Sequence, residues 1–146
     1  YARLLPRAEA IVLLIGINDL RFRPPEAILA NQRALLAALP ADVPLVLVAL
    51  LPIDARLKRN LDPIAINQVN DGLAAACRAR PGCSFVDAGP ELRDAEGRLR
   101  PDAHEGDGLH LNAEGYRRLA AVLRPALAAA IGEERRAAGA PGEGEE

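Results

Sequence analysis

The sequence predicts an α/β fold in which helices cover a parallel sheet. Two short, uninterrupted apolar runs, residues 10–15 and 45–50, are typical of strands buried on both faces of a sheet. Each run is followed by a pattern of helical period, and strands that alternate with helices pair in parallel through right-handed crossovers. Only three strands are predicted, which is few for a sheet of this kind.

The first apolar run ends at Gly16 and leads to the first predicted helix. Pro24 and Pro25 stand at the start of that helix, where the missing N–H of proline costs no hydrogen bond. Pro40 ends it. Apolar side chains share one face of this helix: Ile28, Leu35, Leu36 and Leu39.

The second apolar run is closed by Pro52, and a second helix begins at Asp62-Pro63. Pro81-Gly82 ends this helix, and residues 84–87 form a third, short strand. The helix has an apolar stripe made of Ile66, Val69, Leu73, Ala76 and Cys77. Two interpretations of Cys77 remain open, a small core residue or a bridge to Cys83, because sequence alone gives no geometry.

The last part of the chain consists of a long loop, a helix and a charged tail. Residues 89–107 form a loop rich in charge and turn residues, long enough to be functional. Asn112 is a good N-cap for the last helix, in which Pro125 predicts a kink. We expect one domain over residues 1–132 and a disordered acidic tail over residues 133–146.

The composition excludes several classes of protein. A net charge of −2 gives no general basic surface, so we expect no nucleic acid among the partners. No apolar run approaches the roughly 18 residues of a membrane span. Two cysteines form neither a disulfide framework nor a zinc-finger spacing. The printed residues contain no Met, so we expect them to be a piece of a longer chain, and no feature indicates a cellular location.

Polar residues follow the first predicted strand, at the sheet edge where ligands bind in open α/β folds. The segment is Gly16-Ile17-Asn18-Asp19. The carboxamide of Asn18 is a neutral donor, suited to an oxygen that becomes negative in a transition state. A plain turn is the alternative interpretation, because Asn and Asp both favour turns.

A second candidate site precedes the last helix. Asp107 stands three residues before His110, across a turn that contains Gly108. The carboxylate can accept a hydrogen bond from Nδ1 of the imidazole, which leaves Nε2 free to act as a general base. The alternative is an Asp–His pair that only stabilises the entrance to the helix.

Further acidic and histidine side chains lie in the same segment. His104 and Glu105, together with Asp107 and His110, offer a set of metal-ligating groups, and metal binding is the alternative interpretation of this segment. We expect instead a solvated His104 in a polar loop, no metal site and no cofactor.

These segments resemble the conserved blocks of one enzyme superfamily. Gly16-Ile17-Asn18-Asp19 resembles the third block of the SGNH (GDSL-type) hydrolases, and residues 107–116 resemble the fifth. Leu50-Leu51-Pro52 and Phe85-Val86-Asp87 are similar in order and spacing. The resemblance implies a flavodoxin-like, three-layer α/β/α fold. It also implies hydrolysis of a small-molecule carboxylic ester or thioester through an acyl-enzyme formed on a serine. His110 is then the base, Asp107 its orienting carboxylate and Asn18 an oxyanion donor.

The chain departs from that pattern upstream. The blocks that carry the nucleophilic Ser and an oxyanion Gly precede the third block, yet residues 1–15 contain neither residue type. Ser84, the only serine, opens the third strand and so lies at the amino-terminal end of the sheet, whereas the candidate site lies at its carboxyl edge. We therefore expect the printed chain to lack the nucleophile and the first strands of the sheet. The alternative function is that of a truncated or degenerate, inactive SGNH-like fragment.

Overall fold

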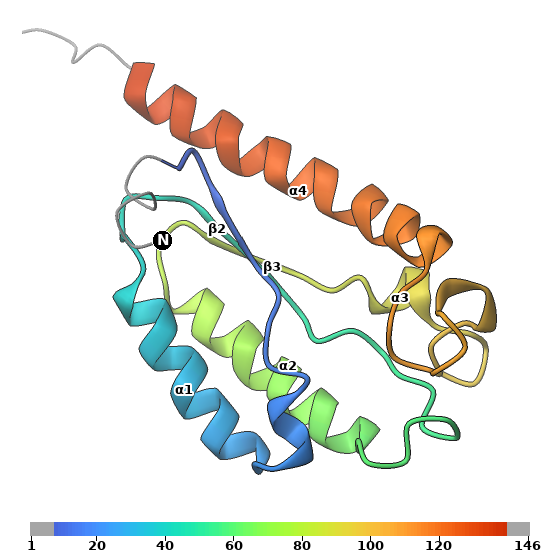
Figure 1. Ribbon diagram of the computed structural model, residues 1–146. Coiled ribbons are helices and arrows are strands. Elements are labelled where there is room, and N and C mark those ends of the chain that lie inside the picture. Colours follow the sequence, from blue (N-terminus) through green and yellow to red (C-terminus); the bar gives the residue numbers. More distant parts are fainter. Residues whose placement is uncertain (1–7, 140–146) are drawn as a thin grey trace, which may run out of the picture.

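A parallel three-stranded sheet lies between two layers of helices in the computed structural model, which describes residues 8–139 (Figure 1). Helices α1 (Pro25–Ala38) and α2 (Pro63–Arg78) cover one face of the sheet, and α4 (Ala113–Gly139) crosses the other. The strands lie in the order β1-β2-β3 and span Ile11–Leu13, Leu45–Val48 and Cys83–Val86. The predicted three-layer α/β/α class is confirmed.

The strands differ in burial because they differ in position. Val46 of the central strand β2 pairs with Val12 of β1 and with Ser84 of β3, and every residue of β2 is buried. Within the described residues β1 has a neighbour on its β2 side only, and Val12 is 42% exposed. The expectation that the first strand is buried on both faces is therefore wrong, because α4 packs mainly on β2 and β3 and leaves Val12 uncovered on that face.

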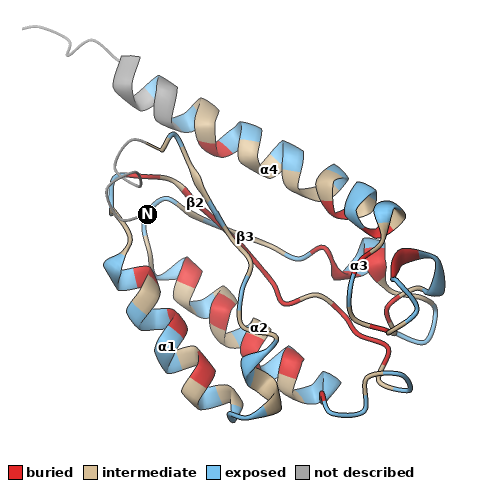
Figure 2. Ribbon diagram, in the orientation of Figure 1, coloured by how far each residue is buried: buried red, intermediate tan, exposed pale blue. Residues whose placement is uncertain are grey.

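The core has one part on each face of the sheet (Figure 2). Leu45 and Leu47 of β2 point toward α1 and α2, where they meet buried side chains such as Ile28 and Leu73. Val46 and Val48 point the other way, toward Ala130 of α4. This alternation follows from the two-residue period of a strand, and it holds all three layers together.

The predicted helix starts are confirmed at their caps. Asp62 accepts a hydrogen bond from the backbone N–H of Ile64 at 2.9 Å, and Asn112 accepts one from Gly115 at 3.0 Å. The helix α4 continues past Pro125 as far as Gly139. The expectation of a disordered tail from residue 133 is therefore wrong for residues 133–139, because this segment is rich in Glu, Arg and Ala, which favour helix. Residues 140–146 lie outside the described part.

The predicted loop of residues 89–107 contains ordered structure. It includes the short helix α3 (Gly89–Leu92) and the 3₁₀ turn η3 (Pro101–Ala103), and it packs against the start of α4. Leu92 and Leu99 are fully buried there, in a cluster of their own with Leu119. The segment is thus a fixed support for the residues that follow it. None of the helices described between residues 8 and 139 has the length and apolar character needed to cross a bilayer.

The open question about Cys77 is answered by a disulfide bond to Cys83, which joins the end of α2 to the start of β3. Cys77 is also buried in the main core, so both interpretations of this residue hold.

We predict that replacing both cysteines by Ala lowers the free energy of unfolding by about 2 kcal/mol, because the six-residue separation closes only a small loop. Denaturant titration of the two forms checks this value. Equal stability of the two forms, each measured under oxidising conditions, would contradict it.

Candidate active site

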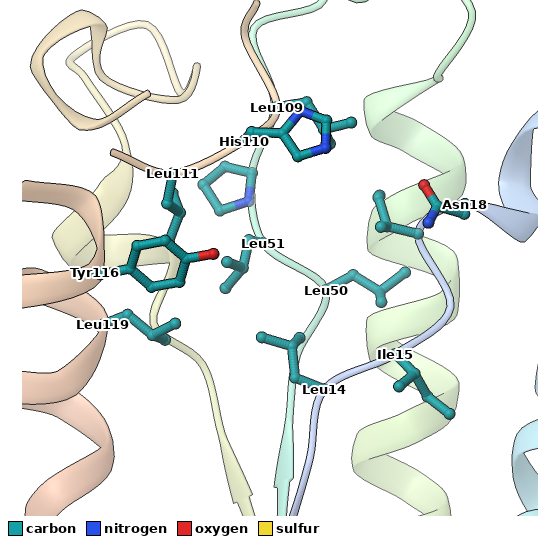
Figure 3. Close-up of a pocket in the computed structure, with 12 residues that line it drawn as sticks. Leu14, Ile15, Asn18, Leu50, Leu51, Leu109, His110, Leu111, Tyr116 and Leu119 are labelled. Carbon is teal, nitrogen blue, oxygen red and sulfur yellow. The ribbon is translucent and has the colours of Figure 1, made fainter. Parts of the chain in front are cut away.

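A cavity of about 230 Å³ lies beyond the carboxyl ends of β1 and β2 (Figure 3). Its lining is mainly apolar, and its polar side chains come from Asn18, His110 and Tyr116. The complete lining is Leu14, Ile15, Ile17, Asn18, Leu50, Leu51, Pro52, Leu109, His110, Leu111, Tyr116 and Leu119. The fold thus brings two of the three predicted site residues, Asn18 and His110, to one cavity.

Asn18 is carried by the turn that ends β1. Gly16 has φ of +119°, a conformation that side-chain-bearing residues rarely adopt, and the turn leads into the 3₁₀ segment η2 (Asp19–Arg21). Gln32 of α1 donates a hydrogen bond from Nε2 to the carbonyl of Ile15 at 3.0 Å. Asn18 itself is exposed, and its side chain makes no capping bond to η2, so the carboxamide is left available at the cavity.

The chain beyond β2 is held in the same way. Asn70 of α2 accepts a hydrogen bond from the N–H of Leu50 at 2.7 Å and donates one to its carbonyl at 3.0 Å. Gln32 and Asn70 were not identified from the sequence. The available signal is a polar amide on the apolar face of each helix: Gln32 lies between Ile28 and Leu36, and Asn70 beside Val69 and Leu73.

Asp107 and His110 form a close pair. The Oδ2 atom of Asp107 lies 2.5 Å from Nδ1 of His110, while Oδ1 accepts hydrogen bonds from the backbone N–H groups of Leu109 and His110 at 3.0 and 2.9 Å. The His110 side chain is 71% exposed and reaches the cavity (Figure 3). The predicted local pairing of these two residues is present.

The charge on Asp107 fixes the form of the imidazole. Hydrogen bonds from the ring of His110, and then from the backbone N–H groups of His110 and Leu109, hold the pKa of the Asp107 carboxyl well below its usual range. An ionised carboxylate only accepts hydrogen bonds, so Nδ1 of a neutral His110 carries the proton. Its Nε2 atom then has a free lone pair, as a general base requires.

The turn that carries this pair rests on Asp54. The N–H of Asp54 donates to the carbonyl of Gly108 at 2.9 Å. A Cβ atom at position 108 would lie 2.9 Å from the carbonyl oxygen of Asp54, and φ of Gly108 is +72°. Position 108 thus requires glycine on two counts, its backbone conformation and the close approach of the Asp54 backbone.

The side chain of Asp54 is buried and paired. It is 1% exposed and accepts two hydrogen bonds from the guanidinium of Arg56, at 3.0 and 2.6 Å. These bonds outweigh the effect of burial and lower the pKa of Asp54 from 3.8 to about 2. Sequence analysis missed this residue because an isolated Asp in a loop gives no sign of burial.

The expectation of a solvated His104 is wrong. His104 is 8% exposed, and its Nδ1 atom accepts hydrogen bonds from the N–H groups of Gly106 and Gly108. It is buried because the chain turns back on itself between residues 104 and 111, which encloses the ring. Across residues 8–139 the structure contains no group of three or more side chains arranged to hold a metal ion.

Ser84 is not among the residues that line the cavity. It is paired with Val46, toward the amino end of the sheet, whereas the cavity lies beyond the carboxyl ends of β1 and β2. The fold therefore does not bring Ser84 to His110.

The fold and site define a three-layer α/β/α protein with an Asp–His pair and an amide donor at the carboxyl edge of its sheet. The chain belongs to the GDSL-like lipase/acylhydrolase family, whose model matches residues 2–118. This match confirms the resemblance deduced from the two sequence blocks.

Several solved structures share this fold. A Streptococcus pneumonia protein, provisionally described as a platelet activating factor, is 28% identical with a TM-score of 0.73, over 81% of this chain and 59% of that one. A GDSL-like lipase from Bacteroides thetaiotaomicron is 20% identical with a TM-score of 0.69, over 85% and 64%. A carbohydrate esterase of family 3 from Talaromyces cellulolyticus is 18% identical with a TM-score of 0.70, over 87% and 60%.

The chain spans about three fifths of the length of these structures. No curated protein matches the sequence.

We predict that Asp54→Asn lowers the free energy of unfolding by about 1–2 kcal/mol at pH 7, because the charge-assisted bonds to Arg56 are lost. The pKa of Asp54 is lowered on folding, so the stability that it contributes is present above pH 3.8 and is lost as the pH falls toward 2. The difference between the two proteins should therefore shrink over that range. Denaturant titrations at pH 7, 4 and 2.5 measure it, and a constant difference would contradict the assignment.

Proposed function

We propose that this chain provides the catalytic base, its orienting carboxylate and one oxyanion donor of an ester hydrolase. The observation that carries the proposal is the shared cavity. His110, with Nδ1 bonded to Asp107, and Asn18 reach the same apolar space from two segments far apart in the sequence. A base and a neutral donor at one cavity are two of the groups that acyl transfer requires, beside a nucleophile.

The base acts at both steps of the reaction. Nε2 of His110 takes the proton of a serine hydroxyl as its oxygen attacks the carbonyl carbon of the ester. The imidazolium then gives this proton to the leaving alcohol or thiol as the bond to the acyl carbon breaks, and an acyl-enzyme remains. Water attacks the acyl-enzyme in the same way and releases the acid and the free serine. Asp107 stays ionised throughout and stabilises the imidazolium.

Asn18 acts on the carbonyl oxygen. Its carboxamide donates a hydrogen bond to this oxygen, which gains negative charge only in the tetrahedral transition state. A substrate that fills this largely apolar cavity displaces water from the reacting group, and a hydrogen bond to a charged oxygen is stronger in such surroundings.

The proposal places the nucleophilic serine outside residues 1–146. The position of Ser84 near the amino end of β3 supports this, as does the absence of any other serine or threonine in the printed sequence. The edge of β1 that has no neighbour within residues 8–139 leads to the cavity, since Leu14 and Ile15 line it. A further strand paired there would end beside His110. The alternative is that residues 1–146 form an inactive chain by themselves.

We predict that His110→Ala, in a chain that includes the serine, lowers kcat by about 10⁴–10⁶ and leaves the melting temperature nearly unchanged. Asp107→Asn should also be severe, because the amide favours the wrong imidazole tautomer. Hydrolysis of a short-chain nitrophenyl ester measures both. More than a tenth of the wild-type activity in His110→Ala would remove this residue from the mechanism.

We predict that Asn18→Ala lowers kcat by about 10²–10³ with little change in KM, because the donor meets its full charge only in the transition state. Asp19→Ala, in the same turn, serves as the matched control and should retain activity. An unchanged kcat for Asn18→Ala would reject the role of oxyanion donor and leave Asn18 with a role in the turn only.

We predict that Ser84→Ala leaves hydrolysis unchanged and that residues 1–146 alone do not hydrolyse the ester above background. Assays of this chain and of a chain extended upstream, each with and without Ser84→Ala, make the comparison. Hydrolysis by residues 1–146 that is lost on Ser84→Ala would overturn the placement of the site. A lack of activity in the extended chain would favour the inactive alternative.

A further inference from the structure

We propose that His104, in its neutral form, is a positioning residue for the catalytic pair, and that it acts by accepting hydrogen bonds from the backbone around Asp107. This inference rests on the proposed function, because it assigns a role in that reaction. His104 is absent from the cavity lining, so any effect on catalysis passes through the segment between residues 104 and 111.

That segment is a closed turn on antiparallel flanks. His104 and Leu111 form an isolated β-bridge, the N–H of Glu105 donates to the carbonyl of His110 at 2.9 Å, and the N–H of Asn112 donates to that of Ala103 at 3.1 Å. The tip of the turn, residues 105–110, contains both Asp107 and His110.

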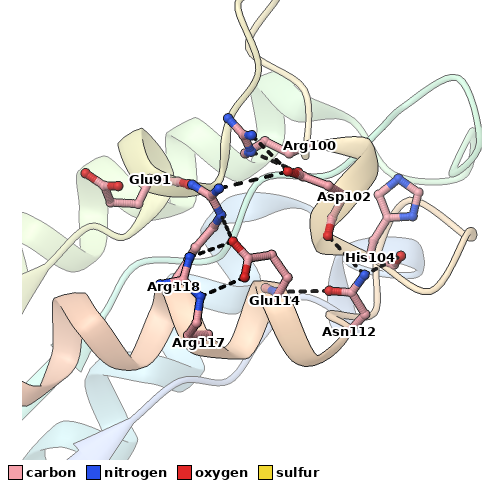
Figure 4. Close-up of polar contacts among 9 residues, drawn as sticks. Glu91, Arg100, Asp102, His104, Asn112, Glu114, Arg117 and Arg118 are labelled. Atoms are coloured by element: carbon pink, nitrogen blue, oxygen red, sulfur yellow. Dashed lines mark hydrogen bonds and ion pairs between the residues drawn. The ribbon is translucent and has the colours of Figure 1, made fainter.

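The flanks of this turn are anchored to α4 (Figure 4). The carboxamide of Asn112 donates to the carbonyls of Asp102 and His104 at 3.1 and 3.2 Å. Arg118 of α4 also lies 3.9 Å from the carboxylate of Asp102, and its guanidinium donates a hydrogen bond to the carbonyl of Glu91 at 3.4 Å. These contacts hold the base of the turn but do not reach its tip.

The tip is held from two sides: the carbonyl of Gly108 accepts a hydrogen bond from the N–H of Asp54, and the ring of His104 binds the tip from within the turn. Its Nδ1 atom accepts hydrogen bonds from the N–H of Gly106 at 2.9 Å and from the N–H of Gly108 at 3.3 Å. These two amides stand on either side of Asp107. A ring nitrogen that accepts hydrogen bonds carries no proton, so the ring is neutral with its proton on Nε2.

Fixing these amides fixes the carboxylate between them. The three hydrogen bonds that Asp107 accepts lie at 2.5–3.0 Å, and a small displacement of its backbone would break them. The pair is largely exposed, so side-chain packing does not hold it in place. The internal acceptor of His104 therefore sets the direction in which Nε2 of His110 points.

A purely structural role for His104 makes a different prediction from this one. If the ring only fills space, Leu at this position preserves the site, because its volume is similar. If the acceptor matters, Asn preserves the site, because its Oδ1 atom can accept from the N–H two residues later, as in an Asx turn. The variants His104→Leu and His104→Asn thus separate the two roles.

The experiment measures turnover and the hydrogen bond of the pair independently, in the full-length protein. We expect His104→Leu to lower kcat for a short-chain nitrophenyl ester about 10- to 100-fold, with KM nearly unchanged. His104→Asn should stay within about threefold of wild type. Proton NMR of the Nδ1–H of His110, which needs no substrate, should show its downfield resonance in wild type and His104→Asn and its loss in His104→Leu.

Each possible result either supports or overturns the inference. Wild-type kcat and an unchanged resonance in His104→Leu would overturn it, as would equal losses in the Leu and Asn variants. If the Leu variant does not fold, His104→Gln, whose oxygen lies one bond farther from the backbone, takes its place. If the wild type is inactive, but the Nδ1–H resonance is present in wild type and in His104→Asn and is lost in His104→Leu, the proposed function is rejected and the positioning role of His104 stands.

Discussion

The site depends on the hydrogen-bond partners of backbone N–H and C=O groups at the points where the chain leaves the sheet. Inside the sheet the N–H and C=O groups of β2 have partners on the neighbouring strands, but beyond the strand ends these partners are gone, and an unpaired buried group is costly. Side chains supply the missing bonds. Gln32 binds the carbonyl beyond β1, Asn70 binds both groups of Leu50 beyond β2, and His104 binds two amides of the turn before α4.

These contacts fix the geometry of a solvent-exposed site. An exposed, hydrogen-bonded pair of side chains contributes little to stability by itself, since water competes for both partners. The pair of Asp107 and His110 is nevertheless held at 2.5 Å, because Asp107 also accepts from two backbone amides of a closed turn. That turn is seated on the backbone of Asp54 through Gly108. The order of the site thus comes from hydrogen bonds of the backbone, while the imidazole of His110 stays exposed at the cavity.

The family match includes the residues at the carboxyl edge of the sheet. The GDSL-like match covers the chain from before β1 into α4, and within it lie the cavity, the Asn18 turn and the Asp–His pair. Within residues 8–139, β1 has a neighbour only on its β2 side, and Val12 and Ile15 beside the other edge are partly exposed. The Asp–His pair and the Asn18 turn thus lie at the same end of the sheet as this edge strand.

The sequence alone determined what depends on neighbours along the chain. The central strand follows from an apolar run, the helix starts from Asp62 and Asn112, and the pairing of Asp107 with His110 from a separation of three residues. Each of these requires only a few adjacent residues, whose geometry is fixed by local backbone conformation.

Only the tertiary structure decided what depends on residues far apart in the chain. It brought Asn18 to the cavity of His110, turned Gln32 and Asn70 toward strand ends, and buried Asp54 and His104. It also exposed β1, whose apolar run indicated burial on both faces. A polar residue is buried when the surrounding backbone offers it hydrogen bonds, and which backbone surrounds it is set by the packing of helices on the sheet.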